Sequence, residues 1–297
     1  MSFLLVACAA CGGSNGGEPN GPDGGAGTDG QNGSNGSNGS NAPTETKAGF
    51  ITIESTRYTV SSTPVEQGYA SGTVYRIPPP MMGASSACST TTAGACQIQT
   101  CTTSGSGGTV PITYTDSGLM TISGVQVNDG TMTLTPGAYG YITVSGAVAL
   151  FNGGDTVRFQ APGNPQGAPA FDVSLVAPTS VQVTAPTFTQ GSVTASATQD
   201  LAVAWSGPAT SDVTVQVTGG VTGSSAVARC TFTGSAGYGV VPVAALSAVR
   251  AVGGNSSIMI SGESKTMKTP DGWQLSFSLL TYGLTPSGIA VGTLAFE

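Results

Sequence analysis

Residues 201–207 read LAVAWSG and residues 211–219 read SDVTVQVTG. In both stretches apolar side chains occupy every second position, as in a β-strand that buries one face and exposes the other. Gly207 and Pro208 follow the first run and favour a break between the two. We therefore predict a pair of antiparallel strands in which Trp205 is buried in the core, because an indole carries much apolar area.

The same alternation recurs throughout the chain after Lys47. The short runs are rich in β-branched residues and separated by Gly, Pro, Asn, Asp and Ser, and they cover residues 73–77, 120–122, 131–135, 141–144, 156–159, 171–175, 181–184, 201–205, 213–217, 227–232, 258–260 and 273–279. Strands spaced by about 8–12 residues are typical of antiparallel sandwiches. Only residues 242–249, PVAALSAV, predict a helix, with proline at its first turn. The fold class is therefore expected to be all-β, with one or two antiparallel β-sandwich domains.

The composition predicts four segments. Residues 1–11 are expected to be the remnant of a lipoprotein signal peptide, and residues 12–47 a disordered tether rich in Gly, Ser and Asn with no large apolar side chain to bury. Two Ala-Pro breaks, at 177–178 and 185–186, favour a boundary near residue 180. We expect a cysteine-containing β-domain over residues 48–180 and a sandwich of the immunoglobulin or fibronectin type III kind over residues 181–297.

The beginning of the chain resembles a lipobox. Leu5-Val6-Ala7-Cys8 places a branched apolar residue and two small residues before a cysteine, the residue that carries the lipid in bacterial lipoproteins. Cys11, followed by two glycines, is the alternative lipidation site. A signal peptide needs an apolar region of roughly 7–15 residues, so we expect the true start to lie upstream. Neither cysteine is followed by Asp, which favours the outer membrane, with the body periplasmic or at the cell surface.

The net charge of residues 48–297 limits the classes of molecule that we expect this part of the chain to bind. Residues 48–297 hold seven basic and eleven acidic side chains, a formal charge of about −4. Nucleic-acid binding needs clustered Lys and Arg, so we expect no nucleic-acid partner. No run reaches about 18 apolar residues, and no second membrane element is expected.

Four cysteines lie in the body: Cys88, Cys96, Cys101 and Cys230. An even number in an exported chain predicts disulfides, and three pairings are possible. Residues 97–100 alternate like a strand, which would hold Cys96 and Cys101 about 16 Å apart, too far for a bond. Two pairings remain, and we prefer Cys88–Cys96 with Cys101–Cys230, because residues 89–95 resemble a hairpin loop.

The chain contains no histidine. Ser-His-Asp and Cys-His catalysis are therefore excluded, as are the usual zinc sites, and we expect no metal, no cofactor and no enzymatic activity. A carboxylate pair of the glycosidase kind is the remaining catalytic possibility. Its candidates lie mostly in turn-like sequences, where we expect exposed side chains that stabilise their own backbone: Asp116, Asp129, Asp155, Asp172, Asp200, Asp212, Glu263 and Asp271.

Three aromatic residues are candidates for stacking against a sugar ring: Tyr139, Tyr141 and Trp273. The two tyrosines are spaced by two and would share one face of a strand. Packing in the core is the competing interpretation of all three.

Several stretches carry a resemblance to a group of predicted lipoproteins and secreted proteins abundant in myxobacteria: YASGTVYRIP, CSTTTAGACQIQTC, TLTPGAYG, LFNGGDTVRF, PAFDVSL, RCTFTGSAGYGVVPVAALSAV and TPDGWQLSF. The resemblance implies an exported all-β body and transfers no functional residue. We expect an outer-membrane lipoprotein with a non-catalytic adhesive or matrix role. Its partners would be membrane lipid, bound through the N-terminal cysteine, and an extracellular polysaccharide or surface protein. A carbohydrate-binding module is the alternative.

Overall fold

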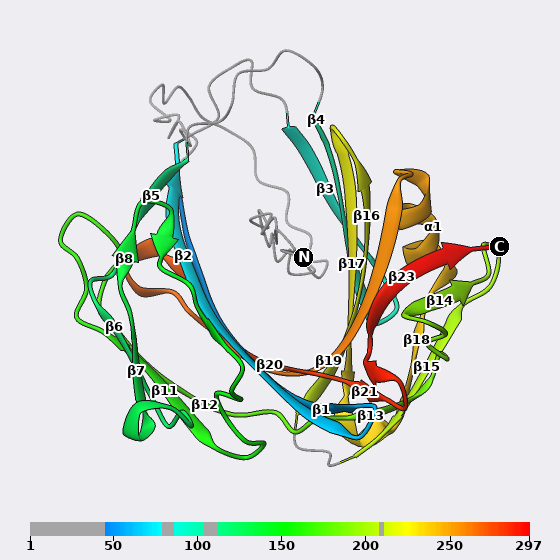
Figure 1. Cartoon of the computed structure of the whole chain (residues 1–297). Helices are drawn as coiled ribbons and strands as arrows, with labels where there is room; N and C mark the ends of the chain where they lie inside the picture. Colours follow the sequence, from blue (N-terminus) through cyan, green and yellow to red (C-terminus); the bar gives the residue numbers. More distant parts are fainter. Residues whose placement is uncertain (1–44, 79–85, 104–111, 208–210) are drawn as a thin grey trace, which may run out of the picture. The chain divides into compact units, whose positions relative to one another are not determined.

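The computed structural model describes residues 45–78, 86–103, 112–207 and 211–297 (Figure 1). Residues Glu45–Glu297 form one compact unit. The lipidation candidates Cys8 and Cys11 lie outside the described residues, as does nearly all of the expected tether. The first strand begins at Thr46 and therefore includes the last two residues of the predicted tether, Thr46 and Lys47.

One large sheet runs through the unit. Its 12 strands are β1 (Thr46–Val60), β2 (Thr63–Ile77), β3 (Ser86–Ala93), β4 (Cys96–Thr103), β5 (Thr113–Thr115), β10 (Val144–Gly146), β14 (Ser192–Ala195), β16 (Asp212–Val221), β17 (Ser224–Thr233), β19 (Asn255–Lys268), β20 (Gln274–Tyr282) and β23 (Val291–Phe296). Their main order is β10-β2-β1-β20-β19-β16-β17-β4-β3, with β5 paired to β2, β23 to β19 and β14 to β23. Most neighbours are antiparallel, but β1 and β20 are parallel.

Smaller sheets cover the large one. The four-stranded sheet has the order β12 (Phe171–Val176), β11 (Thr156–Ala161), β6 (Met120–Ser123), β7 (Thr131–Leu134). The five-stranded sheet has the order β18 (Tyr238–Val241), β15 (Leu201–Ser206), β13 (Gln182–Ala185), β21 (Leu284–Thr285), β22 (Gly288–Ile289). The remaining elements are the pair β8 (Pro136–Gly137) and β9 (Gly140–Tyr141), the helix α1 (Val243–Ala251), and the 3-10 turns η1 (Asn128–Gly130), η2 (Gly234–Ala236) and η3 (Pro270–Gly272). The architecture is the all-β sandwich that the alternating runs predict.

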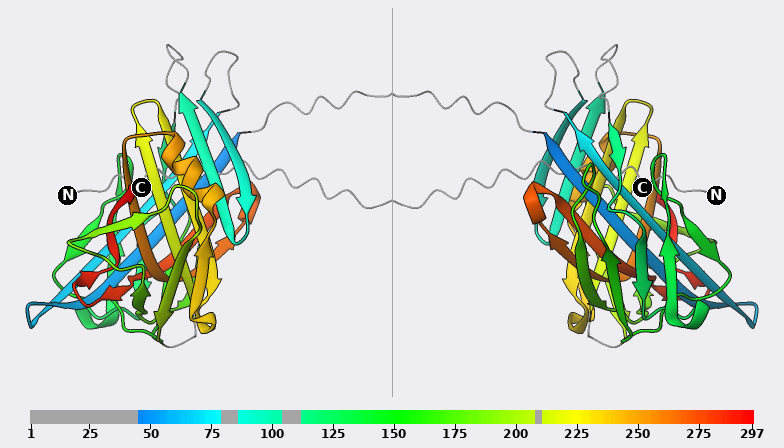
Figure 2. Two further views of the ribbon diagram at one scale, coloured as in Figure 1. Left: turned by 90° about the vertical axis from the view of Figure 1, so that its right-hand side faces the viewer. Right: turned by 90° about the vertical axis from the view of Figure 1, so that its left-hand side faces the viewer.

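The large sheet bends so that its two covering layers lie on the outside of the curve (Figure 1). In Figure 2, the left view shows the layer with α1 from the front. The right view shows the layer with β6, β7, β11 and β12 from the front. Each layer forms its own core with the sheet. One core contains Phe277 of β20 and Phe159 of β11, and the other contains Ile260 of β19 and Trp205 of β15.

Both cores lie on the same face of the large sheet. In the register of β19 and β20, Leu279 pairs with Ser264, which has the same parity along β19 as Ile258 and Ile260. Paired residues and every second residue share a face. We call this the outer face. The opposite face, called the inner face, contributes no residue to either core cluster.

The predicted boundary near residue 180 does not separate two sheets. The core that contains β6, β7, β11 and β12 also takes Trp273, Leu275 and Phe277 from the far end of the chain. The other core takes Cys96 and Ile98 from the first part. Strand β1 pairs directly with β20, so the segments 48–180 and 181–297 interleave in one sheet.

The disulfides are Cys88–Cys101 and Cys96–Cys230. Our preferred pairing was wrong, and the other arrangement left open is the one found. The reason lies in the β3–β4 hairpin, which turns at Gly94 and Ala95 with Ala93 opposite Cys96. The residues predicted as a loop are strand, so Cys88 lies opposite Cys101. Gly94 has a positive φ of 55°, which glycine adopts without steric cost.

The predicted pairing of residues 201–207 with residues 211–219 is wrong, because β15 and β16 lie in different sheets. Two other local predictions are confirmed. Trp205 is 4 % exposed, and its indole N–H donates a 2.8 Å hydrogen bond to the carbonyl oxygen of Gly234. Helix α1 begins after Pro242 and packs Ala245, Leu246 and Val249 into the core. The carboxylate of Asp200 accepts the backbone N–H of Val243 at 2.7 Å, which satisfies one of the free donors at the helix start.

Candidate functional site

The inner face carries the polar side chains that occupy every second position of the alternating strands. Because side chains of a strand point to opposite faces in turn, the residues between the core positions gather here. They are mostly hydroxyl and amide side chains: Thr52, Thr56, Ser71, Thr73, Gln97, Gln99, Thr214, Gln216, Thr218, Ser225, Ser257, Ser261, Ser276 and Ser278. We take this face as the candidate functional site because it presents many hydrogen-bonding groups that the cores do not use.

A row of residues crosses the middle of the inner face on β1, β20 and β19. Leu280 pairs with Glu54 on one side and with Glu263 on the other. The three strands lie side by side (Figure 1). The sheet thus places two glutamates on one face with a single residue between them, although more than 200 residues separate them in the sequence.

Glu54 has one neutral partner. The phenol O–H of Tyr282 donates a 2.8 Å hydrogen bond to Oε2 of Glu54. Burial raises the pKa of the Glu54 carboxyl above its usual value, and the hydrogen bond from Tyr282 opposes this shift only partly. The pKa of Tyr282 is also raised, first by its own burial and then by the charge of Glu54. Glu54 therefore tends to keep its proton.

Glu263 has the opposite environment. Its Oε2 accepts hydrogen bonds from the guanidinium of Arg229 and, at 2.8 Å, from the hydroxyl of Thr214. The side chain of Glu263 is 7 % exposed. The carboxyl group of Glu263 therefore has one cationic donor and one hydroxyl donor. We name Glu54, Tyr282, Ser261, Thr214, Arg229 and Glu263 the glutamate cluster.

Two further features border the glutamate cluster. Lys265 follows Glu263 on the same face, and its pKa is lowered by desolvation and by repulsion from Arg229. Ser261 is fully buried, and its Oγ is a buried polar atom without a hydrogen-bond partner. A buried hydroxyl left unsatisfied costs about 1–3 kcal/mol.

Three aromatic rings lie at one end of the inner face, and a fourth, from the β8–β9 turn, meets them at the edge strand β5. Phe50 of β1 and Tyr75 of β2 stack with ring centroids 6.3 Å apart. Tyr114 of β5 pairs with Tyr75 in the register, and its ring meets that of Tyr139 edge to face at 5.5 Å. Tyr139 is 78 % exposed and Tyr114 is 37 % exposed. We name these four residues the aromatic strip.

The three residues predicted as candidates for stacking against a sugar ring lie in different environments. Tyr139 belongs to the aromatic strip and keeps an exposed ring. Tyr141 is buried, and its phenol accepts from the N–H of Ser117 and donates to the carbonyl of Gly118. Trp273 is 2 % exposed, and the guanidinium of Arg76 lies 5.3 Å from its ring centroid. Tyr141 and Trp273 therefore serve packing, and they have no open ring face for a sugar.

Most acidic candidates behave as turn or surface residues. Asp129 and Asp271 have positive φ angles inside short turns, and Asp172 forms an exposed ion pair with Arg158. Glu263 does not follow this expectation, because it lies in a long strand and is buried. Glu54 was not among the candidates. The alternation of residues 50–56 places its side chain opposite Ile51 and Ile53, and this is the sequence signal that could have identified it.

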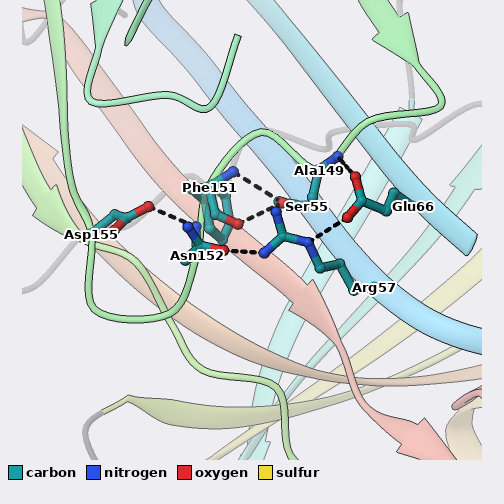
Figure 3. A network of polar contacts seen from close by, with 7 residues as sticks. All are labelled: Ser55, Arg57, Glu66, Ala149, Phe151, Asn152 and Asp155. Carbon is teal, nitrogen blue, oxygen red and sulfur yellow. Dashed lines mark hydrogen bonds and ion pairs between the residues drawn. The ribbon is translucent and has the colours of Figure 1, made fainter. Parts of the chain in front are cut away.

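A different polar network lies on the outer face (Figure 3). Arg57 bridges Glu66 and Asn152, while Ser55 exchanges hydrogen bonds with the backbone of Phe151. Glu66 also accepts the N–H of Ala149, and Asp155 accepts the N–H of Asn152. These contacts fasten the segment before β11 onto the β1–β2 hairpin. The network is structural, since its groups satisfy one another.

No group of three or more His, Cys, Asp or Glu residues in the described part of the chain is placed to hold a metal ion. Among the same residues no helix is long and apolar enough to span a bilayer. Neither the models of known protein families nor the sequences of curated proteins match this chain.

Proposed function

We propose that this protein binds a polysaccharide on the inner face of its large sheet, while an N-terminal lipid anchor holds it at the outer membrane. One observation carries the proposal: a complete face of a 12-stranded sheet is left out of both cores and is lined by hydroxyl, amide and aromatic side chains. Adhesion to extracellular matrix is the role that this binding would serve.

The chemistry of the inner face suits sugars. Hydroxyl and amide groups both donate and accept hydrogen bonds, as sugar hydroxyls do, and they recur at every second residue along neighbouring strands. The exposed rings of Tyr114 and Tyr139 offer apolar surface with a polar tip, on which the C–H face of a sugar ring can stack. The low charge of the body argues against a nucleic acid as the extended ligand.

The binding test uses the purified full-length chain on an array of defined glycans and, for each hit, a titration with the soluble polysaccharide. Tyr139→Ala should weaken binding about tenfold, which corresponds to about 1.4 kcal/mol. Tyr238→Ala is the matched control, because Tyr238 is also exposed, at 69 %, but lies in β18 of the five-stranded sheet. An array without hits would reject the proposal, and so would equal losses in both variants.

The anchor is tested separately. Cells that express the chain from its natural start and are fed a fatty-acid analogue should label the protein, and Cys8→Ala should abolish the label. Loss of label in Cys11→Ala alone would move the lipid to Cys11. No label in the unaltered protein would remove the anchor and leave the binding proposal in place.

A further inference from the structure

The two glutamates of the inner face have a defined spacing. Glu54 and Glu263 are both register partners of Leu280. Neighbouring strands are about 4.8 Å apart, so the Cα atoms of the two glutamates are about 10 Å apart across the sheet. Register partners point to the same face, and both carboxyl groups therefore border the surface above Leu280.

Their environments divide the two carboxyl groups into different roles. Glu54 contacts the neutral phenol of Tyr282, and among the described residues it forms no ion pair. Glu263 is paired with Arg229. Burial raises the pKa of the Glu54 carboxyl group, whereas Glu263 lies against the guanidinium of Arg229. A carboxyl group beside a neutral donor and one beside a cation suit the roles of acid and base.

A third observation is an unsatisfied hydroxyl group beside the two glutamates. Ser261 precedes Glu263 by two residues on the same strand face and pairs with Tyr282 and Thr214. Its buried hydroxyl has no protein partner. A sugar hydroxyl bound between the two glutamates would supply the missing hydrogen bond.

We propose that Glu54 and Glu263 are the general acid and the general base of a site that hydrolyses glycosidic bonds, an inference that rests on polysaccharide binding by the inner face. Glu54 gives its proton to the glycosidic oxygen as the bond from that oxygen to the anomeric carbon breaks. Glu263 takes a proton from a water molecule, whose oxygen bonds to the anomeric carbon from the opposite side. Proton exchange with solvent restores both carboxyl groups, and no cofactor or oxidant is needed.

The distance between the two carboxyl groups of a glycosidase predicts the anomeric configuration of its product. Inverting glycosidases keep their carboxyl groups about 6.5–9.5 Å apart to admit the water, whereas retaining enzymes need about 5–5.5 Å. Two side chains that rise from Cα atoms about 10 Å apart on one face fit the wider range. The product is therefore expected to have the inverted anomeric configuration.

The experiment incubates the full-length chain with each polysaccharide that it binds and measures reducing ends, with proton NMR of the first-formed anomer. We expect hydrolysis with inversion, and a loss of at least about 100-fold in Glu54→Gln and in Glu263→Gln. Binding of the polysaccharide should persist in both variants. Glu66→Gln is the matched control, because Glu66 is a strand glutamate on the outer face, and it should retain full hydrolysis.

The outcomes separate the two proposals. Binding without any release of reducing ends overturns the hydrolytic site and leaves polysaccharide binding in place. Hydrolysis that survives both substitutions overturns the assignment of the two glutamates, and absence of binding overturns both proposals. If either variant fails to fold, the pH dependence of the unaltered protein decides. The rate must fall at alkaline pH as the acid loses its proton, and a rate without this fall contradicts the role of Glu54.

Discussion

The two faces of the large sheet are made by the same strands and differ in almost every chemical respect. In β20, Leu275, Phe277 and Leu279 point outward into a core and are fully buried, while Ser276 and Ser278 alternate with them on the inner face. The outer face holds the protein together by burying apolar area. The inner face contributes no residue to either core cluster and carries hydroxyl side chains at these positions instead. Stability and binding can therefore be altered separately along a single strand.

The largest expected effect concerns the disulfides, one on each face. Cys96–Cys230 joins buried residues of the outer face and closes a separation of 134, whereas Cys88–Cys101 closes a separation of 13. Loop-closure entropy predicts that replacing both cysteines of the first bond by alanine costs about 5 kcal/mol, and of the second about 3 kcal/mol. Urea unfolding of the two double variants measures this difference. Equal costs would contradict the entropic account.

A core substitution on the outer face should cost slightly less. Phe277 is fully buried and contacts the rings of Phe159 and Phe171 at 5.5 and 4.9 Å. Phe277→Ala removes these contacts and leaves a cavity, which should lower the free energy of unfolding by about 3–5 kcal/mol. The control is the next residue, Ser278→Ala, which loses one hydrogen bond to Thr52 at 3.0 Å and should cost about 1 kcal/mol. A larger loss for Ser278→Ala would reverse the comparison of the faces.

The next effect depends on pH. Burial raises the pKa of Glu54 in the folded state, so this carboxyl group binds its proton more tightly in the folded protein than in the unfolded chain, and its contribution to stability falls as pH rises. Glu54→Gln has no such proton and removes the cost. The variant should therefore gain stability relative to the unaltered protein between pH 4.5 and pH 8, and the two should change in parallel below pH 4. Thermal unfolding at several pH values measures this. A gain that is present at low pH and lost at high pH would show the opposite sign.

The smallest effect on stability is expected at the aromatic strip. Tyr139 is 78 % exposed and shares one edge contact with Tyr114. Tyr139→Ala should change the free energy of unfolding by less than about 0.5 kcal/mol, although it should weaken the proposed polysaccharide binding. Urea unfolding and the binding titration on the same sample test the separation. A stability loss of several kcal/mol would mean that the strip is part of a core.

The sequence predicts what depends on near neighbours. Alternation identifies most of the strands, the Pro242 run identifies α1, and the burial of Trp205 follows from its place in an alternating run. The pairing of β1 with β20 depends on residues more than 200 positions apart, and no local pattern encodes it. The shared sheet and the glutamate cluster were therefore not predicted. The disulfide pairing was missed for a smaller reason, the position of one turn at Gly94.

The position of β1 also has a mechanical consequence. It is the first strand after the proposed tether, and it lies between β2 and β20, with fifteen residue pairs on one edge and seven on the other. If the proposed anchor and a bound polysaccharide pulled in opposite directions, the force would enter β1 at Thr46 and run along the strand. Hydrogen bonds loaded along a strand would then have to break together rather than one after another. β1 would carry such a load in shear, as a strand that is held on both of its edges.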